Sequence, residues 1–189
     1  MAVVCFGGSR ALSSAFAPLV SRVVGAVVAR GALVSVGCAS GADAFVVSAV
    51  LSAGSASLLR VCAVGSASGA GFWRGSCSLA LLRSAGAAGA RVLWLAGGGL
   101  AVPLRARLFA RSLSSLRGCG CAVFFLASAS SSGSLAVAAA AAASGLPVFA
   151  FSCGFAGAPS PLAGVSGRWS PASFLGFRCW AWLSVAGPG

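Results

Sequence analysis

The chain has 189 residues, 59% of them hydrophobic, and a formal net charge of +12. It contains no His, and its one carboxylate side chain is Asp43, which excludes a Ser-His-Asp or Cys-His catalytic arrangement. The absence of Lys excludes a Walker-type phosphate loop. This length fits one domain with a core of its own, with room for a short appendage.

The amino-acid alphabet is restricted. Apart from Met1 and Asp43, the chain uses ten residue types, and each of them can be encoded without adenine. We infer a gene with adenine-depleted codon usage, an inference that frequent adenines in the gene sequence would contradict. A high positive charge ordinarily favours a nucleic-acid partner, and a high hydrophobic content favours a membrane. Here the alphabet itself supplies both properties, so each carries less weight.

The eight cysteines include no CxxC pair, and the chain has no His. This pattern argues against a zinc site. Several cysteines fall in apolar strand-like runs, where the thiol behaves as a small hydrophobic group. We therefore expect free structural cysteines in a reducing cytoplasm rather than a disulfide framework. The first residues resemble a strand and not a signal peptide, so the expected localisation is cytoplasmic.

Strand-like and helix-like segments alternate along the first 150 or so residues. The expected strands are Ala2–Phe6, Ala32–Val36, Arg60–Val64, Arg91–Ala96, Cys119–Ala127 and Val148–Phe151, and the expected helices are Phe16–Arg30, Ala44–Leu51, Cys77–Arg83, Pro103–Leu116 and Ser134–Ser144. This order predicts an α/β Rossmann-like fold, doubly wound, with a mainly parallel sheet and helices on both faces. We expect residues 1–153 to form this domain and residues 154–189, rich in Pro and Trp, to form a packed tail or interaction segment.

Three of the turns that lead from a strand into a helix are rich in Gly or Ser: Gly7–Arg10, Gly37–Asp43 and Ser130–Ser134. In open α/β sheets, ligands bind outside the carboxyl ends of the strands. Glycine lets the backbone approach an anion, and the start of the following helix presents unpaired N–H groups. The three turns together predict a phosphate-binding pocket.

The same turns carry a family resemblance. Gly8-Ser9-Arg10 resembles a "GSR" motif, and the stretch from Ser35 to Ala44 resembles "SGxAxGxDA". Pro103-Leu104-Arg105-Ala106-Arg107 is similar to "PxRNR", with Ala106 in place of Asn, and the stretch from Ser132 to Ala150 resembles "SGSLxTAxxA…VFAVPG". These motifs, spread over roughly Val3 to Gly154, resemble the SLOG superfamily, which joins DprA (SMF) proteins to the lonely guy enzymes, and they are closest to the DprA branch.

The resemblance implies a pocket for nucleotides or nucleic-acid phosphates, and DprA-like members bind single-stranded DNA. The implied ligand-binding residues are Gly8, Ser9, Arg10, Gly37, Gly41, Asp43, Arg105, Arg107, Ser132, Gly133 and Ser134. From the residues alone, Asp43 is expected to cap the helix that follows it, which is compatible with a place beside the ligand. Arg10 and Arg107 are equally compatible with phosphate contacts and with ordinary surface positions. Five other arginines are expected to be surface residues: Arg22, Arg30, Arg60, Arg83 and Arg91.

The expected protein is a binding protein rather than an enzyme. The lonely guy enzymes carry "PGGxGTxxE", and the position of that Glu falls on Val137 here. General acid–base chemistry would depend on Asp43 or a Cys, and the one open route to catalysis is a water activated by Asp43. We expect no catalytic residue, no metal and no cofactor.

Three functions remain at this point. A DprA-like protein would bind single-stranded nucleic acid, with Phe72-Trp73-Arg74 as a base-stacking candidate, although core packing is the commoner role of a Trp. A sensor module would bind one small nucleotide. A membrane protein is suggested by the uncharged stretch 118–167, but Gly133, Pro147 and dense Ser argue against a spanning helix. We expect a nucleotide or single-stranded nucleic acid as the partner and no membrane, and a homodimer stays open.

Overall fold

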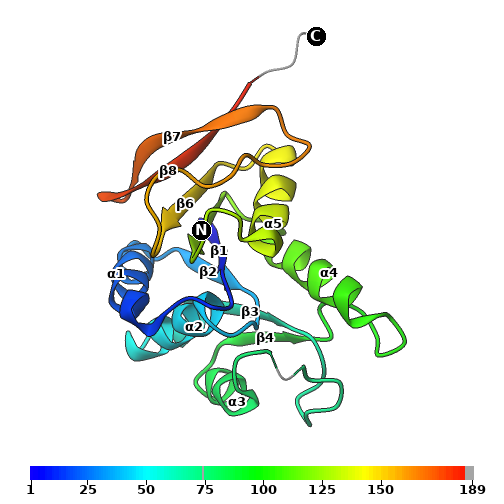
Figure 1. Cartoon of the computed structure of the whole chain (residues 1–189). Coiled ribbons are helices and arrows are strands. Elements are labelled where there is room, and N and C mark those ends of the chain that lie inside the picture. The colour runs from blue at the N-terminus through cyan, green and yellow to red at the C-terminus, as the bar shows by residue number, and fades with distance from the viewer. Residues whose placement is uncertain (74, 186–189) are drawn as a thin grey trace.

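The computed structural model describes residues 1–73 and 75–185, and it has the α/β, Rossmann-like doubly wound fold that the sequence predicts (Figure 1). The strands are β1 (Val3–Gly8), β2 (Leu33–Val36), β3 (Leu59–Ala63), β4 (Arg91–Trp94), β5 (Cys121–Leu126), β6 (Val148–Ser152), β7 (Gly167–Phe174) and β8 (Phe177–Ser184). The helices are α1 (Ala17–Val28), α2 (Ala42–Ser52), α3 (Leu79–Ala87), α4 (Leu104–Leu116) and α5 (Ser132–Ala143), with short 3₁₀ turns at Ser14–Phe16 and Ala56–Leu58.

The strands form one sheet in the order β4-β3-β2-β1-β5-β6-β8-β7. Strands β1 to β6 pair in parallel, whereas β8 pairs antiparallel with both β6 and β7. The chain winds outward from β1 to β4 and then returns to place β5 on the other side of β1. The order of the strands therefore reverses between β1 and β5, and this is where ligands bind in open α/β sheets.

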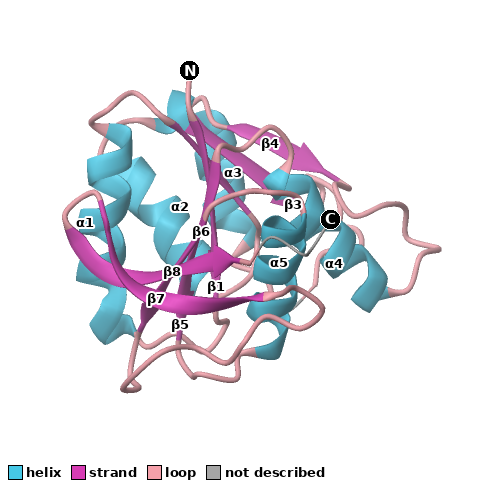
Figure 2. Cartoon of the chain, turned by 90° about the horizontal axis from the view of Figure 1, so that it is seen from above, coloured by secondary structure: helices cyan, strands magenta, loops and turns pink. Residues whose placement is uncertain are grey.

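Helices cover both faces of the parallel strands, as Figure 2 shows: α1 and α2 lie on one side of the sheet, α4 and α5 on the other. Alternate residues of each buried strand enter different cores. In β1, Val4 and Phe6 pack in the core with α1 and α2, and Cys5 packs in the core with α5. This explains why β1 and β5 are almost uninterrupted apolar runs.

Helix α1 shows how the core pattern is encoded. Its buried residues are Val20, Val23, Val24 and Val27, the spacing of one helical face. Pro18 lies in the first turn, where a missing N–H costs nothing. The Ser13 hydroxyl accepts a hydrogen bond from Ala15 N–H in the 3₁₀ turn that leads into the helix. The predicted helix Phe16–Arg30 is confirmed, with ends that differ by one or two residues.

Arg60, which we expected to be a surface residue, instead holds the end of α4. It is half-buried on β3, and its Nη2 donates to the carbonyl oxygens of Ser115, at 3.3 Å, and Arg117, at 2.8 Å. Its Nε donates to Ser35 Oγ at 3.0 Å. A cation at a helix C-terminus is favoured by the unpaired carbonyls and the helix dipole. Arg60 thus fixes α4 against the sheet.

The prediction that Val148–Phe151 is the last strand is wrong, because the following residues form the hairpin β7–β8. The turn consists of Leu175 and Gly176, which both have positive φ angles, 51° and 90°, as a tight hairpin turn requires. Pro171 made this segment look unlike a strand. It lies in β7, which is the edge of the sheet, where a residue without an N–H is tolerated.

Candidate ligand-binding site

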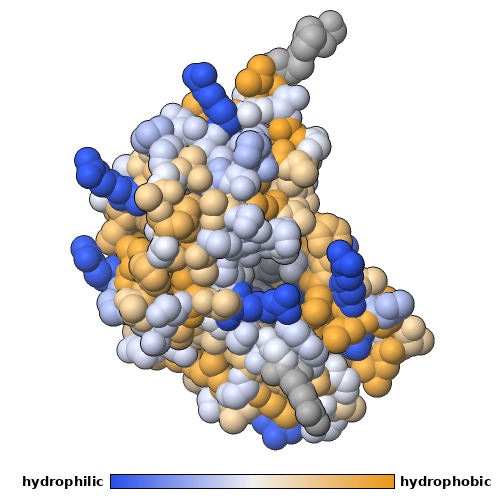
Figure 3. All heavy atoms as spheres, in the orientation of Figure 1, coloured by the Kyte–Doolittle hydropathy of each residue, from blue (hydrophilic) through white to orange (hydrophobic). Residues whose placement is uncertain are grey.

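A cavity of about 1620 Å³ opens at the carboxyl ends of the parallel strands, next to the point where the strand order reverses. Its walls come from the turn after β1, the start of α2, the indole of Trp73, one side of α4 and the segment from Ala127 to Val137. In the space-filling view a hollow lies near the middle of this face, with strongly hydrophilic side chains beside it (Figure 3). Two of the three predicted phosphate turns, and part of the third, therefore meet at one site.

The turn after β1 is held very close to β5 and α2. A Cβ on Gly8 would lie 2.7 Å from the Cβ of Ala42 and nearer still to the carbonyl oxygen of Phe125. Only glycine allows this approach. The backbone N–H of Ser9 donates to Phe125 O at 2.9 Å, and Ser9 O accepts from Ala42 N–H at 3.2 Å. The predicted "GSR" turn is thus a junction between three elements of the fold.

The side chain of Ser9 extends this junction to α5. Its hydroxyl accepts a hydrogen bond from Ala127 N–H at 2.9 Å and shares a hydrogen bond of 2.7 Å with the hydroxyl of Ser131. Ser131 is the N-cap residue of α5, but its side chain makes no capping bond. Its hydroxyl instead bonds Ser9 and donates to Ser128 O at 3.1 Å. The first N–H groups of α5 are consequently left available to a ligand.

The start of α5 is open to the cavity. Ser132 and Gly133 are exposed, both line the cavity with Ser134, and nothing lies within 4 Å of the place where a Cβ on Gly133 would be. Unpaired N–H groups and the positive end of the helix dipole favour an anion at this point. The predicted helix Ser134–Ser144 in fact begins at Ser132, so the last three residues of the Ser-rich turn belong to the first turn of the helix.

Arg10 lies beside Trp73 at the edge of the cavity. The carbon at the centre of its guanidinium group is 5.0 Å from the centroid of the indole, a distance suited to a cation–π contact. Arg10 is exposed and Trp73 is half-buried, and both line the cavity. This contact orients an exposed positive charge toward the site. Arg74, the third residue of the predicted stacking segment, lies outside the described residues.

Asp43 is not the cap of α2, which corrects the expectation from the sequence. The N-cap residue is Gly41, at φ 69° and without a side-chain bond, and α2 begins at Ala42. Because Ala42 N–H already bonds Ser9 O, tertiary contact supplies the partner that a capping side chain would provide. Asp43 lies inside the first turn, where its Oδ2 accepts from Ala39 N–H at 2.9 Å.

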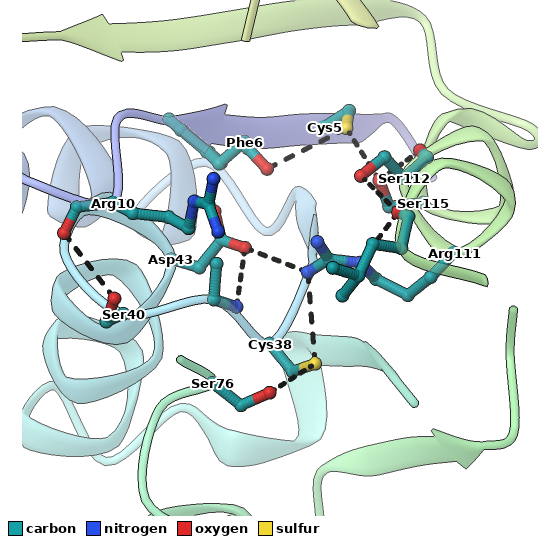
Figure 4. Close-up of polar contacts among 12 residues, drawn as sticks. Cys5, Phe6, Arg10, Cys38, Ser40, Asp43, Ser76, Arg111, Ser112 and Ser115 are labelled. Atoms are coloured by element: carbon teal, nitrogen blue, oxygen red, sulfur yellow. Dashed lines mark hydrogen bonds and ion pairs between the residues drawn. The ribbon is translucent and has the colours of Figure 1, made fainter. Parts of the chain in front are cut away.

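Asp43 and Arg111 form a buried ion pair (Figure 4). Arg111 Nη1 lies 3.2 Å from Asp43 Oδ2, and the two side chains are 7% and 8% exposed. Burial raises the pKa of the Asp43 carboxyl, and the Arg111 charge and the Ala39 N–H offset part of that rise. A Cβ on Gly37 would lie 2.6 Å from Asp43 Oδ2, so glycine at position 37 leaves the space that this pair occupies.

The structure places nine of the eleven predicted site residues around the cavity: Gly8, Ser9, Arg10, Gly37, Asp43, Arg105, Ser132, Gly133 and Ser134. Gly41 lies behind the cavity wall, where its backbone packs against the carbonyl oxygen of Arg10. Arg107 is buried and does not line the cavity, and its Nε donates to Val102 O at 3.0 Å.

Sequence reasoning missed Arg111 and Phe109, which line the cavity from α4. The signal for Arg111 was available in part, since a buried Asp requires a cationic partner. With thirteen arginines in the chain, that rule alone does not identify which arginine is the partner. Phe109 carried no signal, because an aromatic residue within a helix is usually part of the core; here it is 45% exposed.

The carboxyl and thiol groups of the cavity wall are engaged within the protein. The Asp43 carboxylate is held by Arg111 and Ala39. A hydrogen bond with Cys119 and burial raise the pKa of the Cys5 thiol, also in the cavity wall, well above its ordinary value, which keeps it protonated and a poor nucleophile. In the described part of the chain, no group of three His, Cys, Asp or Glu residues is placed to hold a metal ion.

Among residues 1–73 and 75–185, no helix has the length and apolar character needed to span a membrane. All eight cysteines lie in the described residues and are free. Comparison of the chain with protein-family models, with curated proteins and with solved structures finds no match.

Proposed function

We propose that this protein binds a phosphate-bearing ligand, a nucleotide or a stretch of single-stranded nucleic acid, in the cavity between β1 and β5. The observation that carries the proposal is the meeting of the Ser9-Arg10 turn with the uncapped start of α5. Ser131, the cap residue of α5, is engaged with Ser9 at 2.7 Å, so the N–H groups behind it stay available. A phosphate group there would accept hydrogen bonds from the backbone and face the Arg10 guanidinium.

The positions of the charges support the same ligand class. Arg10 and Arg105 are exposed residues on two segments of the cavity wall, the turn after β1 and the first turn of α4. The one carboxylate side chain of the protein is buried in an ion pair, so it repels an incoming anion little. The sequence motifs that resemble the DprA branch favour the same site independently of the geometry.

The first test is binding of inorganic pyrophosphate and of a nucleoside monophosphate, measured by calorimetry, to the wild type and to Arg10→Ala. We expect Arg10→Ala to weaken binding about tenfold, because it removes a charged hydrogen-bond donor. Arg30→Ala is the matched control, because it also removes one positive charge from an exposed position. Arg30 lies just beyond the end of α1, where it donates to Ala26 O. Equal losses of affinity in the two variants would show that only the net charge of the protein matters, and would contradict the proposed site.

Single-stranded nucleic acid is favoured over a lone nucleotide by the size of the cavity. A volume of about 1620 Å³ exceeds the roughly 300–1,000 Å³ of pockets for single small molecules. Trp73 and Phe109 both line it, and aromatic residues of this kind stack nucleobases without sequence preference. This form of the proposal expects affinity to rise with oligonucleotide length and to fall with salt. A single small nucleotide would show neither length dependence nor more than a modest salt effect.

A further inference from the structure

Arg111 presents an unused hydrogen-bonding edge to the floor of the cavity. Its Nη1 contacts Asp43 Oδ2 at 3.2 Å and Cys38 Sγ at 3.8 Å, and its Nε donates to Leu108 O at 3.4 Å. Its Nη2 has no hydrogen-bond partner among the residues that the structure describes, although the side chain is only 7% exposed. Figure 4 shows Arg111 reaching from α4 to Asp43 and Cys38, and Arg111 lines the cavity together with Cys5 and Ser115.

The ion pair holds this edge in place. Asp43 is itself fixed by the Ala39 N–H, and the absence of a side chain at Gly37 lets the carboxylate and the guanidinium meet. An arginine fixed at Nη1 and Nε has a planar group of defined direction, so its remaining N–H groups point to one place. Arg111 is therefore preorganised to donate hydrogen bonds into the cavity.

The floor differs in charge from the rim. At the rim, Arg10 and Arg105 are exposed and have no carboxylate partner among the described residues. At the floor, the charge of Arg111 is compensated by Asp43 at 3.2 Å. A phosphate placed beside Arg111 would also lie beside the Asp43 carboxylate and gain little. The floor accordingly suits a neutral acceptor, and the rim suits the phosphate.

We propose that Arg111 is a specificity-determining residue that donates a hydrogen bond to an uncharged oxygen of the ligand, a sugar hydroxyl or a base carbonyl, while the phosphate of the same ligand lies at the rim. This inference rests on the proposed function of the cavity. It also gives the orientation of the bound ligand: the sugar or base enters the cavity, and the phosphate stays at the rim. Asp43 acts through Arg111 as a positioning residue.

The test compares three probes, inorganic phosphate, ribose 5-phosphate and the nucleoside monophosphates, on the wild type and on Arg111→Lys. Lysine keeps the charge and the ion pair with Asp43 but has no second nitrogen to face the cavity. We expect the wild type to bind at least one of the two larger probes more tightly than phosphate. We expect Arg111→Lys to lose about tenfold for that probe and to bind inorganic phosphate as the wild type does.

The outcomes separate the two proposals. A loss that includes ribose 5-phosphate assigns the contact to the sugar, and a loss confined to nucleoside monophosphates assigns it to the base; either result supports the inference. Equal affinities of wild type and Arg111→Lys for all three probes would overturn it and leave the phosphate site standing. A wild type that binds a single-stranded oligonucleotide but none of the three probes would overturn this inference alone, and a wild type that binds neither the probes nor the oligonucleotide would overturn both. Should Arg111→Lys fail to fold, the double variant Asp43→Asn, Arg111→Met removes both charges together and leaves no donor at position 111, and the same outcomes apply to it.

Discussion

The hydroxyl groups of Ser9 and Ser131 share a hydrogen bond of 2.7 Å although the two residues are 122 positions apart in the chain. This bond joins the turn after β1 to the start of α5 across the point where the strand order reverses. Since Ser9 also accepts the Ala127 N–H at 2.9 Å, one hydroxyl sets the spacing of two loops that face the cavity. The phosphate site thus depends on a side chain that is itself buried.

Replacing Ser9 with Ala should lower both stability and ligand affinity. The partly buried Ala127 N–H would lose its hydrogen-bond partner, and we expect a loss of about 1 kcal/mol, the lower end of the range for an unsatisfied donor. Chemical denaturation measures the first effect, and pyrophosphate binding measures the second. Ser55→Ala is the control, because the Ser55 hydroxyl makes one solvent-exposed hydrogen bond, to Ala53 O in its own turn; its effect should stay within about 0.5 kcal/mol. If Ser9→Ala proves as stable as Ser55→Ala, the junction role of Ser9 is wrong.

Replacing Gly37 with Ala should disrupt the ion pair beneath the cavity. The added Cβ would lie 2.6 Å from Asp43 Oδ2 and still closer to Arg111 Nη1, so both groups would have to move. We expect a loss of about 3 kcal/mol in the free energy of unfolding, from overpacking and the weakened buried pair. Denaturant titration gives this value directly.

The matched control for that variant is Gly25→Ala. Gly25 lies within α1, and no atom outside its own helical turn lies within 4 Å of the place where its Cβ would be. Alanine is the better helix former, so this variant should gain about 0.5–1 kcal/mol. Opposite signs for the two Gly→Ala changes are the expected result, and a loss at position 25 as large as that at position 37 would remove the steric explanation.

Acid should stabilise this protein through Asp43, contrary to the behaviour of most proteins. In the folded state, burial raises the pKa of the Asp43 carboxyl above its ordinary value of 3.8. Between the ordinary pKa and the raised pKa, the folded chain therefore binds more protons than the unfolded chain. The free energy of unfolding therefore falls as pH rises from about 4 through the raised pKa. Thermal melts from about pH 3 to pH 7 measure the slope, which no His obscures. The slope should vanish in Asp43→Asn; if it persists there, another group causes it.

Much of the fold could be predicted from the sequence, because helices and strands leave local patterns of apolar and turn-forming residues. Buried parallel strands need apolar runs, and the runs around Val34 and Val123 supplied them. The hairpin β7–β8 was not predicted, because Pro171 is an apparent strand breaker within it. The edge position that makes Pro171 acceptable is a property of the whole sheet.

The site residues, too, were predicted where the sequence signal is local and missed where it depends on distant contacts. The turns at Gly8 and Gly133 were found because glycine and serine at the end of a strand have a local meaning. The pairing of Asp43 with Arg111 spans 68 residues, and no spacing rule selects Arg111 over the neighbouring Arg107. Position along the helix decides between them, because residues four apart share nearly the same helix face but lie one turn apart. Arg111 lies against the Gly37 turn, whereas Arg107 donates to Val102 O.

The two arginines of the "PxRNR"-like stretch should therefore differ in a binding experiment. Arg105 is exposed on the cavity wall, so Arg105→Met should weaken binding of a single-stranded oligonucleotide and lower the slope of log affinity against log salt by about one, the value for one lost phosphate contact. Arg107 is buried, its Nη1 has no hydrogen-bond partner among the described residues, and it does not line the cavity. Arg107→Met keeps the apolar part of the side chain and removes the same charge, so its salt slope should match that of the wild type. A reduced slope in Arg107→Met and an unchanged one in Arg105→Met would contradict binding of the nucleic acid in the cavity.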